Sequence, residues 1–362
     1  MGGAVVATLS ATPVVVPMKR AVRTASGAIL EAPLLLVDLA TKEGVVGRCY
    51  LFGFQKFTLK PLRDLVLALG AMVEGDALAP RAMSEKLRAR TKLFGTRGLV
   101  GMAVSAIDMA AWDAAARAAG LPLARFLGGA PRPVPAYLGN GVGVVKAAEA
   151  GREAEELARL GFRAIKLRIG HPRLEDDLAA ARAVRKAIPP DVALMTDYNQ
   201  GLDVAEAIRR GRALDGEGLY WIEEPVRADD FAGAAQVAAA IATPVQIGEN
   251  FQSPFEVERA LAANASDFVM LDAQQVGGVT GWLAGMALAE AAGKPCSSHL
   301  FQEYSAHLLA VTPTAGWLEW FDIADPVLKE PLALADGFVT APERPGAGIE
   351  WDEKAVARYR LD

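Results

Sequence analysis

Cysteine is nearly absent from this chain, since only Cys49 and Cys296 occur in 362 residues. Nothing in the sequence pairs them, which argues against a disulfide framework and favours a reducing, cytoplasmic location. Long apolar runs are missing as well. The Ala-rich segment 100–119 is interrupted by Asp108 and Asp113, whereas a membrane span needs roughly 18 uninterrupted apolar residues. We therefore expect no membrane partner.

An excess of positive charge is also missing. The chain has 38 basic and 43 acidic residues, a net charge of −5 that is spread along the sequence. Nucleic-acid-binding domains carry a clustered basic patch, so we expect no nucleic-acid partner. The hydrophobic fraction of 52% instead indicates a large buried core, and the length suits a barrel with a smaller domain.

Three carboxylates recur at an even spacing in the middle of the chain. Asp197, Glu223 and Glu249 are 26 residues apart, and each follows a short apolar run that is typical of a buried strand. One strand–helix unit of a parallel barrel takes roughly 30 residues, and its active site lies at the carboxyl ends of the strands. Three acids that converge there repel one another unless a cation lies among them, and oxygen ligands suit Mg²⁺. The spacing therefore predicts a magnesium site.

Strand-like and helical segments alternate regularly from Val134 onward, which predicts an α/β fold with a closed parallel barrel. An open doubly wound sheet is the alternative, but no Gly-rich dinucleotide loop opens any of the helices. The eight expected strands are 134–138, 164–169, 192–197, 219–223, 245–247, 268–272, 295–299 and 317–319.

The first third of the chain lacks this alternation and predicts a separate α+β domain, residues 1–130. The barrel would then span 131–325, and the irregular tail 326–362 would return to the first domain. The expected strands of the first domain are 5–16, 34–39 and 45–52, with a hairpin turn at 41–44, and its expected helices are 59–72, 82–91 and 98–119.

Further chemistry lies at the other strand ends. Lys166 and Arg168 alternate along one strand and therefore share a face. His299 ends the seventh strand and Asp272 the sixth, where a carboxylate could fix the imidazole tautomer, and Glu319 ends the eighth. A metal, a base and nearby cations suit removal of the weakly acidic proton beside a carboxylate, because they stabilise the enediolate that forms.

Several long segments resemble the mandelate racemase subgroup of the enolase superfamily. They are Tyr50–Phe52, Ala106–Asp113, Trp221–Pro225, Gly277–Trp282 and a stretch from Ser297 to Thr314. The resemblance covers nearly the whole chain. It implies a capping α+β domain over a (β/α)₇β barrel, a required Mg²⁺ held by Asp197, Glu223 and Glu249, and a homo-oligomer.

The resemblance also implies roles for single residues. Asn199 would support the metal or the substrate carboxylate, and His299 with Asp272 would be the base. Glu319 would hydrogen-bond the substrate carboxylate and donate a proton to it. A capping loop, residues 20–33, would help to form a partly apolar pocket. The apolar pocket positions are Val22, Ile29, Phe52, Leu300 and Leu318.

The chain departs from the family pattern at Lys166-Leu167-Arg168, where the usual motif is Lys-x-Lys and its second lysine is a base. Arginine keeps its proton and is a poor base, and Lys166 is better suited to binding the substrate carboxylate. The whole-chain resemblance and the apolar pocket make a Mg²⁺-dependent racemase or epimerase of a small 2-hydroxycarboxylate the first hypothesis. An acid-sugar dehydratase with His299 as its single base is the second, and Arg168 favours it because elimination needs only one base. A metal-binding barrel without catalysis is the third.

Overall fold

The computed structural model describes residues 3–24 and 27–361. Its first element is an antiparallel sheet of three strands in the order β1-β2-β3: β1 (Val6–Thr24), β2 (Gly27–Thr41) and β3 (Val46–Phe52). The expected hairpin turn is confirmed, because the Gly44 amide donates to the carbonyl of Thr41. The first two strands, however, are much longer than expected.

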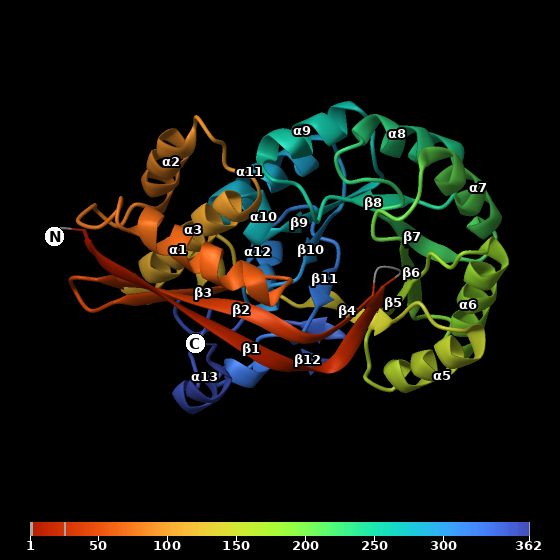
Figure 1. The fold of residues 1–362 in the computed structure, drawn as a ribbon, viewed down its shortest axis with the longest axis horizontal. Helices are drawn as coiled ribbons and strands as arrows, with labels where there is room; N and C mark the ends of the chain where they lie inside the picture. Colours follow the sequence, from red (N-terminus) through yellow and green to blue (C-terminus); the bar gives the residue numbers. More distant parts are fainter. Residues whose placement is uncertain (1–2, 25–26, 362) are drawn as a thin grey trace.

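The expected capping loop is wrong. Residues 20–24 and 27–33 belong to β1 and β2, and Val22 pairs with Ile29 beyond a register shift that follows Pro17. The two strands form a long hairpin that reaches from the N-terminal sheet toward the barrel (Figure 1). Met18, Val22 and Ile29 of this hairpin line a cavity, whereas Arg20 and Arg23 pair with Glu153.

Three main helices pack on this sheet. They are α1 (Leu59–Gly70), α2 (Pro80–Thr91) and α3 (Gly98–Ala118), with the short η1 (Lys56–Thr58) before them and α4 (Leu123–Phe126) after them. By length and composition α3 could cross a membrane, but 83% of its most apolar stretch is buried inside this protein. Such burial is typical of the central helix of a globular core.

The remaining chain alternates strands and helices as the sequence predicted. The strands are β4 (Val134–Val142), β5 (Ala164–Arg168), β6 (Ala193–Asp197), β7 (Leu219–Glu223), β8 (Val245–Ile247), β9 (Phe268–Asp272), β10 (Cys296–His299) and β11 (Leu318–Trp320). The helices are α5 (Ala147–Ala158), α6 (Leu174–Ala187), α7 (Val204–Leu214), α8 (Phe231–Ala240), α9 (Pro254–Ala262), α10 (Ala273–Val276), α11 (Gly278–Ala291) and α12 (Gln302–Val311).

These strands form a parallel ring. Each strand from β4 to β10 pairs with the next, and β11 pairs with β4 through Glu319 and Tyr137. The ring closes between β10 and β11, where the Ser298 amide donates to the Trp317 carbonyl at 2.9 Å. The closed barrel is confirmed, and the open sheet is excluded. Helices α5 to α9 surround it on the outside (Figure 1).

Buried aromatic and sulfur-containing side chains fill the interior of the barrel. Tyr137 and Trp221 meet edge to face at 5.7 Å between ring centroids, beside Met195 and Met270. Since this cluster plugs the interior, the charged residues at the carboxyl ends of the strands face the mouth of the barrel instead.

The N-terminal domain is held over that mouth by hydrogen bonds that are buried or partly buried. The Phe52 amide donates to the Gln274 side chain at 2.7 Å, and Asp108 on α3 accepts from the Thr280 amide at 2.9 Å. Gln274 belongs to α10 and Thr280 to α11, which start just after the end of β9. The hairpin and the carboxyl ends of the strands are thereby held facing each other.

The C-terminal residues first add to the barrel sheet, where β13 pairs with β4, and then reach the N-terminal sheet. Their elements are η2 (Asp325–Val327), β12 (Leu334–Ala335), β13 (Phe338–Val339) and α13 (Glu353–Tyr359). Trp351 donates its indole N–H to Asp38 at 2.8 Å, and the Leu361 amide donates to the Pro13 carbonyl at 2.9 Å. These contacts join the end of the chain to β1 and β2.

Candidate active site

The carboxyl ends of neighbouring strands bring the predicted acids and bases to one place. Asp197 and Glu223 are the last residues of β6 and β7, and Glu249 follows β8 by two residues. Lys166 and Arg168 come from β5, next to β6, and both are buried. The predicted convergence of these side chains is therefore found in the structure.

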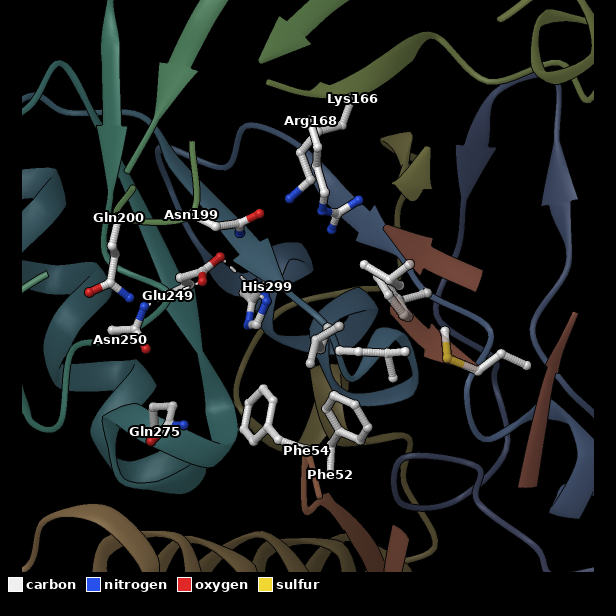
Figure 2. Close-up of a pocket in the computed structure, with 15 residues that line it drawn as sticks. Phe52, Phe54, Lys166, Arg168, Asn199, Gln200, Glu249, Asn250, Gln275 and His299 are labelled. Atoms are coloured by element: carbon white, nitrogen blue, oxygen red, sulfur yellow. Dashed lines mark hydrogen bonds and ion pairs between the residues drawn. The ribbon is translucent and has the colours of Figure 1, made fainter. Parts of the chain in front are cut away.

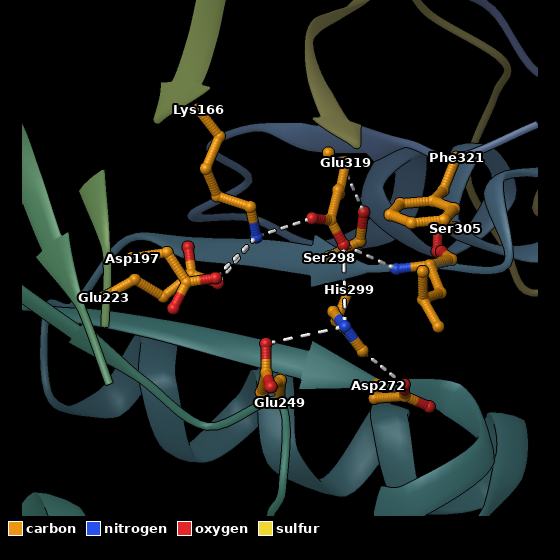
Figure 3. A network of polar contacts seen from close by, with 12 residues as sticks. Lys166, Asp197, Glu223, Glu249, Asp272, Ser298, His299, Ser305, Glu319 and Phe321 are labelled. Atoms are coloured by element: carbon orange, nitrogen blue, oxygen red, sulfur yellow. Dashed lines mark hydrogen bonds and ion pairs between the residues drawn. The ribbon is translucent and has the colours of Figure 1, made fainter. Parts of the chain in front are cut away.

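Lys166 lies among three carboxylates (Figure 3). Its ammonium group is 2.8 Å from Glu319, 2.9 Å from Glu223 and 3.3 Å from Asp197. Burial alone would lower the pKa of Lys166, but the three carboxylates outweigh it and raise that pKa well above its ordinary value. Lys166 is thus a fixed positive charge, which agrees with the preference for carboxylate binding over a base role.

His299 is held by Asp272. The two side chains meet at 2.6 Å between Nδ1 and Oδ2, and the other oxygen of the fully buried Asp272 accepts the amides of Gln274 and Gln275. The carboxylate therefore fixes Nδ1 as the protonated nitrogen and leaves Nε2 free to act. That Nε2 lies 3.5 Å from Glu249 and 3.7 Å from Glu319 (Figure 3).

The charge around His299 controls its protonation. Burial would lower the pKa of His299, but the carboxylates of Glu249, Glu319 and Asp272 outweigh it and raise that pKa to about 10. A neutral base at physiological pH therefore requires positive charge beside Glu249 or Glu319, because such a charge weakens the attraction of these carboxylates for the imidazolium.

Glu319 is ionised in this arrangement. Burial opposes its ionisation, but Lys166 and His299 outweigh burial and lower the pKa of Glu319 to about 2. The carboxylate also accepts the Leu300 amide at 3.1 Å. The implied role of proton donor thus needs a further negative charge nearby to raise this pKa, which a bound substrate carboxylate would supply.

The site contains more acidic than basic side chains, and this excess of negative charge fits a divalent cation. Burial, with smaller contributions from neighbouring carboxylates, raises the pKa of Glu223 to about 8 and also raises that of Glu249. Six buried or half-buried carboxyl groups face three basic groups: Asp197, Glu223, Glu224, Glu249, Asp272 and Glu319 against Lys166, Arg168 and His299. All the acids are hard oxygen donors, which Mg²⁺ prefers.

The acids do not form a finished metal cage. Within residues 3–24 and 27–361, no three acidic, histidine or cysteine side chains converge closely enough to hold a metal ion. The ammonium group of Lys166 lies within ion-pair distance of Asp197 and Glu223 and offsets part of their negative charge. The donor chemistry and the charge excess fit a divalent cation.

Asn199 supports Asp197 directly. Its backbone amide donates to one oxygen of Asp197 at 2.7 Å, and its side-chain amide donates to the other at 2.9 Å. Asn199 adopts a left-handed backbone conformation with φ of 44°, which asparagine tolerates better than most residues. Both donors fix the orientation of the carboxylate at the end of β6.

A cavity of about 280 Å³ opens above these residues (Figure 2). Lys166, Arg168, Asn199, Glu249 and His299 reach it with charged or polar groups, and much of the remaining lining is apolar. The apolar lining comes from the hairpin, from β3 and from two loops of the barrel: Met18, Val22, Ile29, Phe52, Phe54, Leu300 and Phe321. This composition suits a small anion with a partly apolar body.

Four of the five predicted apolar pocket positions line this cavity, and Leu318 does not. Leu318 precedes Glu319 on β11, so its side chain points to the opposite face of the strand and is buried in the core. Its assignment to the pocket is wrong. Sequence reasoning also missed Gln200, Asn250 and Gln275, which line the cavity although no spacing rule marks them.

Arg168 faces the cavity from the wall that it shares with Lys166. One guanidinium nitrogen donates to the Gly139 carbonyl at 2.9 Å, and its buried Nε has no partner among the residues described. A guanidinium group donates hydrogen bonds and has no acceptor, so Arg168 supplies charge and hydrogen bonds to this wall and is a poor base.

Comparisons with known proteins agree with this architecture. Residues 6–128 match the family model of the mandelate racemase / muconate lactonizing enzyme N-terminal domain, and residues 149–355 match the enolase C-terminal domain-like family model. A solved enolase from Bradyrhizobium, complexed with magnesium and mandelic acid, is 45% identical with a TM-score of 0.96, and the match covers 100% of both chains.

Two characterised relatives carry different activities. The L-talarate/galactarate dehydratase of Salmonella typhimurium is 39% identical over 72% of this chain and 66% of its own length. The 3,6-anhydro-alpha-L-galactonate cycloisomerase of Streptomyces coelicolor is 30% identical over 92% of this chain and 93% of its own. The chain therefore belongs to the mandelate racemase and muconate lactonizing enzyme family of the enolase superfamily, and it is an enzyme of the isomerase or lyase type.

Proposed function

We propose that this protein is a Mg²⁺-dependent enzyme of the mandelate racemase type, in which His299 removes the α-proton of a 2-hydroxycarboxylate. The observation that carries the proposal is the 2.6 Å contact between Nδ1 of His299 and Asp272, since it leaves Nε2 as the free basic nitrogen in the cavity. The apolar wall of that cavity suits a substrate whose side chain is partly apolar.

Asp197, Glu223 and Glu249 would hold the magnesium ion. When bound, Mg²⁺ supplies positive charge that stabilises negative charge on the substrate carboxylate. The structural neighbour from Bradyrhizobium, which contains magnesium and mandelic acid, supports the presence of a magnesium site in this protein. Positive charge beside Glu249 would also weaken its hold on the imidazolium of His299, which lowers the pKa of His299 toward the range of a working base.

Several residues of this chain have separate roles in the proton transfer. Nε2 of His299 takes the α-proton as the C–H bond breaks, and the electron pair moves into the substrate carboxylate to form an enediolate. Asp272 stabilises the imidazolium that results. Lys166 and Glu319, which lie 2.8 Å apart, flank the growing negative charge. A substrate carboxylate there raises the pKa of Glu319 and lets it carry a proton to donate.

Racemisation also needs a proton donor on the face of the substrate away from His299. Lys166 and Arg168 form that wall of the cavity (Figure 2). The raised pKa of Lys166 keeps its ammonium group protonated, so it cannot accept a proton and is a weak acid. Arg168 is a poor base for the same task.

Elimination is the second candidate, and Arg168 favours it. In an acid-sugar dehydratase, His299 would remove the α-proton and return it to the hydroxide that leaves the neighbouring carbon. One base suffices for both steps. The relative named as L-talarate/galactarate dehydratase supports this candidate, whereas the apolar wall opposes a substrate with hydroxyl groups on every carbon.

One experiment separates these reactions. The protein is incubated with Mg²⁺ in D₂O with a library of 2-hydroxy acids and sugar acids, and α-proton exchange and products are followed by NMR. Exchange with inversion supports the racemase, and a 2-keto-3-deoxy acid supports the dehydratase. We expect the His299→Asn variant to lose exchange. Full activity in that variant would overturn the assignment of the base, and no exchange with any acid would favour binding without catalysis.

A further inference from the structure

One side of the cavity is lined by side-chain amides. Gln200, Asn250 and Gln275 lie together on the wall away from the apolar residues of the hairpin (Figure 2). Gln200 and Asn250 come from the loops after β6 and β8, and Gln275 comes from α10, which follows β9. All three therefore lie beyond the carboxyl ends of barrel strands, and they line the same cavity. None of them has a role in the proton transfer described above.

The orientation of the Gln275 amide is fixed by a chain of hydrogen bonds. The Gly98 backbone N–H can only donate, and it donates to Oε1 of Gln252 at 2.8 Å. The amide nitrogen of Gln252 must therefore be the donor to Oε1 of Gln275, at 2.9 Å. Gln275 is only 8% exposed. Its Nε2 remains as a donor without a partner within residues 3–24 and 27–361.

Hydrogen bonds also orient the side-chain amides of Gln200 and Asn250. The Ala228 amide donates to Oε1 of Gln200 at 2.9 Å, which leaves the nitrogen of Gln200 uncommitted. The nitrogen of Asn250 donates to Glu224 at 2.9 Å, which leaves the oxygen of Asn250 as an acceptor. The wall thus offers donors and an acceptor whose positions are set before any ligand arrives.

We propose that Gln275, with Gln200 and Asn250 beside it, is a subsite that binds an oxygen atom on the side chain of the substrate. A nearly buried amide donor loses free energy when it has no partner, so a substrate that lacks this oxygen is disfavoured. The substrate class is then a 2-hydroxycarboxylate with an apolar body and at least one further hydroxyl or carbonyl oxygen. This inference rests on the proposed function.

Matched substrate pairs test the subsite. The pairs are mandelate against its 3- and 4-hydroxy derivatives, and lactate against glycerate, measured as kcat/KM for α-proton exchange. We expect the oxygenated member of at least one pair to be preferred by about tenfold or more. The Gln275→Met variant, similar in size but without hydrogen bonds, should lose most of that preference. Gln252→Met should lose part of it, because the amide is then free to turn.

The control is Gln236→Met, the same substitution on the outer face of α8, where Gln236 is exposed. It should keep the preference of the wild type.

The same substrate pairs are also compared by the shift in Tm that each ligand produces with Mg²⁺. Selective binding that Gln275→Met abolishes, without any exchange, would support the subsite and overturn the proposed reaction. Exchange without a preference in any pair, or a preference that survives in Gln275→Met, would overturn the subsite alone. Neither exchange nor selective binding would overturn both.

Discussion

Nδ1 of His299 lies 2.6 Å from Oδ2 of Asp272, and the second oxygen of Asp272 accepts two backbone amides. The backbone therefore holds the carboxylate, and the carboxylate holds the imidazole. The end of β9 thus determines how the base at the end of β10 is oriented.

Asp272→Asn should reduce α-proton exchange by about 10²- to 10⁴-fold, because asparagine neither stabilises the imidazolium nor enforces the tautomer. The side-chain oxygen of asparagine can still accept the amides of Gln274 and Gln275, so the fold should persist. Exchange is measured by NMR in D₂O and folding by Tm. A correctly folded variant with undiminished exchange would show that His299 does not depend on Asp272.

Arg168→Lys should introduce or raise proton transfer on the face of the substrate opposite His299, because a lysine amine can lose its proton whereas a guanidinium group cannot. The measurement is the rate at which deuterium enters the product of opposite configuration. Arg182→Lys is a matched control, since Arg182 is an exposed residue of α6 that pairs with Glu217. Equal rates in both variants and the wild type would mean that Arg168 is only structural.

Magnesium binding should strengthen as pH rises toward 8. Without a cation, burial raises the pKa of Glu223 to about 8 and raises that of Glu249, so these groups must release protons when a cation binds. Calorimetry in buffers of different ionisation enthalpy should detect that release. A concentration of Mg²⁺ 100 times the Kd should stabilise the fold by about 2.7 kcal/mol.

Glu223→Gln should weaken magnesium binding, whereas Glu258→Gln, an exposed change on α9, should not. Removal of Mg²⁺ with EDTA should abolish exchange in the wild type, and added Mg²⁺ should restore it. An affinity that is independent of pH, or unaffected by Glu223→Gln, would contradict the assignment of this ligand.

Gly139→Ala should reduce activity by displacing Glu319. A Cβ at position 139 would lie 2.5 Å from both Cγ and Oε1 of Glu319, closer than real contacts allow. Overpacking of this kind costs about 1–3 kcal/mol, and it moves a group that flanks the substrate carboxylate. Gly216→Ala is the control, since no atom lies within 4 Å of its added Cβ. Unchanged kcat/KM in Gly139→Ala would argue against a role for Glu319.

Acid should destabilise the protein partly through His307. Burial lowers the pKa of His307 from 6.5 to about 4, and Nδ1 of this neutral ring accepts the Ala124 amide. Between these two values the unfolded chain binds the proton more tightly, so stability falls as pH falls from 6.5 toward 4. The loss is about 1.4 kcal/mol for each pH unit at most.

The His307→Gln variant keeps an acceptor for the Ala124 amide but has no titrating ring. Its free energy of unfolding should therefore fall less steeply between pH 6.5 and 4 than that of the wild type, as measured by urea denaturation at each pH. Parallel slopes in the two proteins would show that His307 does not carry this part of the acid sensitivity.

Several features of the fold could be predicted from local sequence. Short apolar runs and their spacing identified all eight barrel strands and placed Asp197, Glu223 and Asp272 at or beside strand ends. The hairpin beyond Pro17 was not predicted as strand, because charged residues interrupt it and its pairing with β2 follows a register shift. Backbone pairing between distant residues determines that conformation, and no local pattern reveals it.

The residues that line the pocket likewise include some that the sequence indicates and others that only the folded structure identifies. Leu318 was assigned by likeness to related proteins, but its neighbour Glu319 faces the interior, and the alternation of a strand sends Leu318 to the other face. Gln275 could not be recognised from the sequence, because its role depends on a hydrogen bond from Gln252, which is itself fixed by Gly98.

The sequence by itself determined where the strands lie along the chain, because local hydrophobic periodicity marks them. It thereby also determined which residues stand at the strand ends. Only the tertiary structure decided what those residues do. Lys166 is a fixed charge because three carboxylates surround its ammonium group, and Nε2 is the free nitrogen of His299 because Asp272 holds Nδ1. Distances and burial set the protonation of each group, and both arise only when strands far apart in the sequence meet.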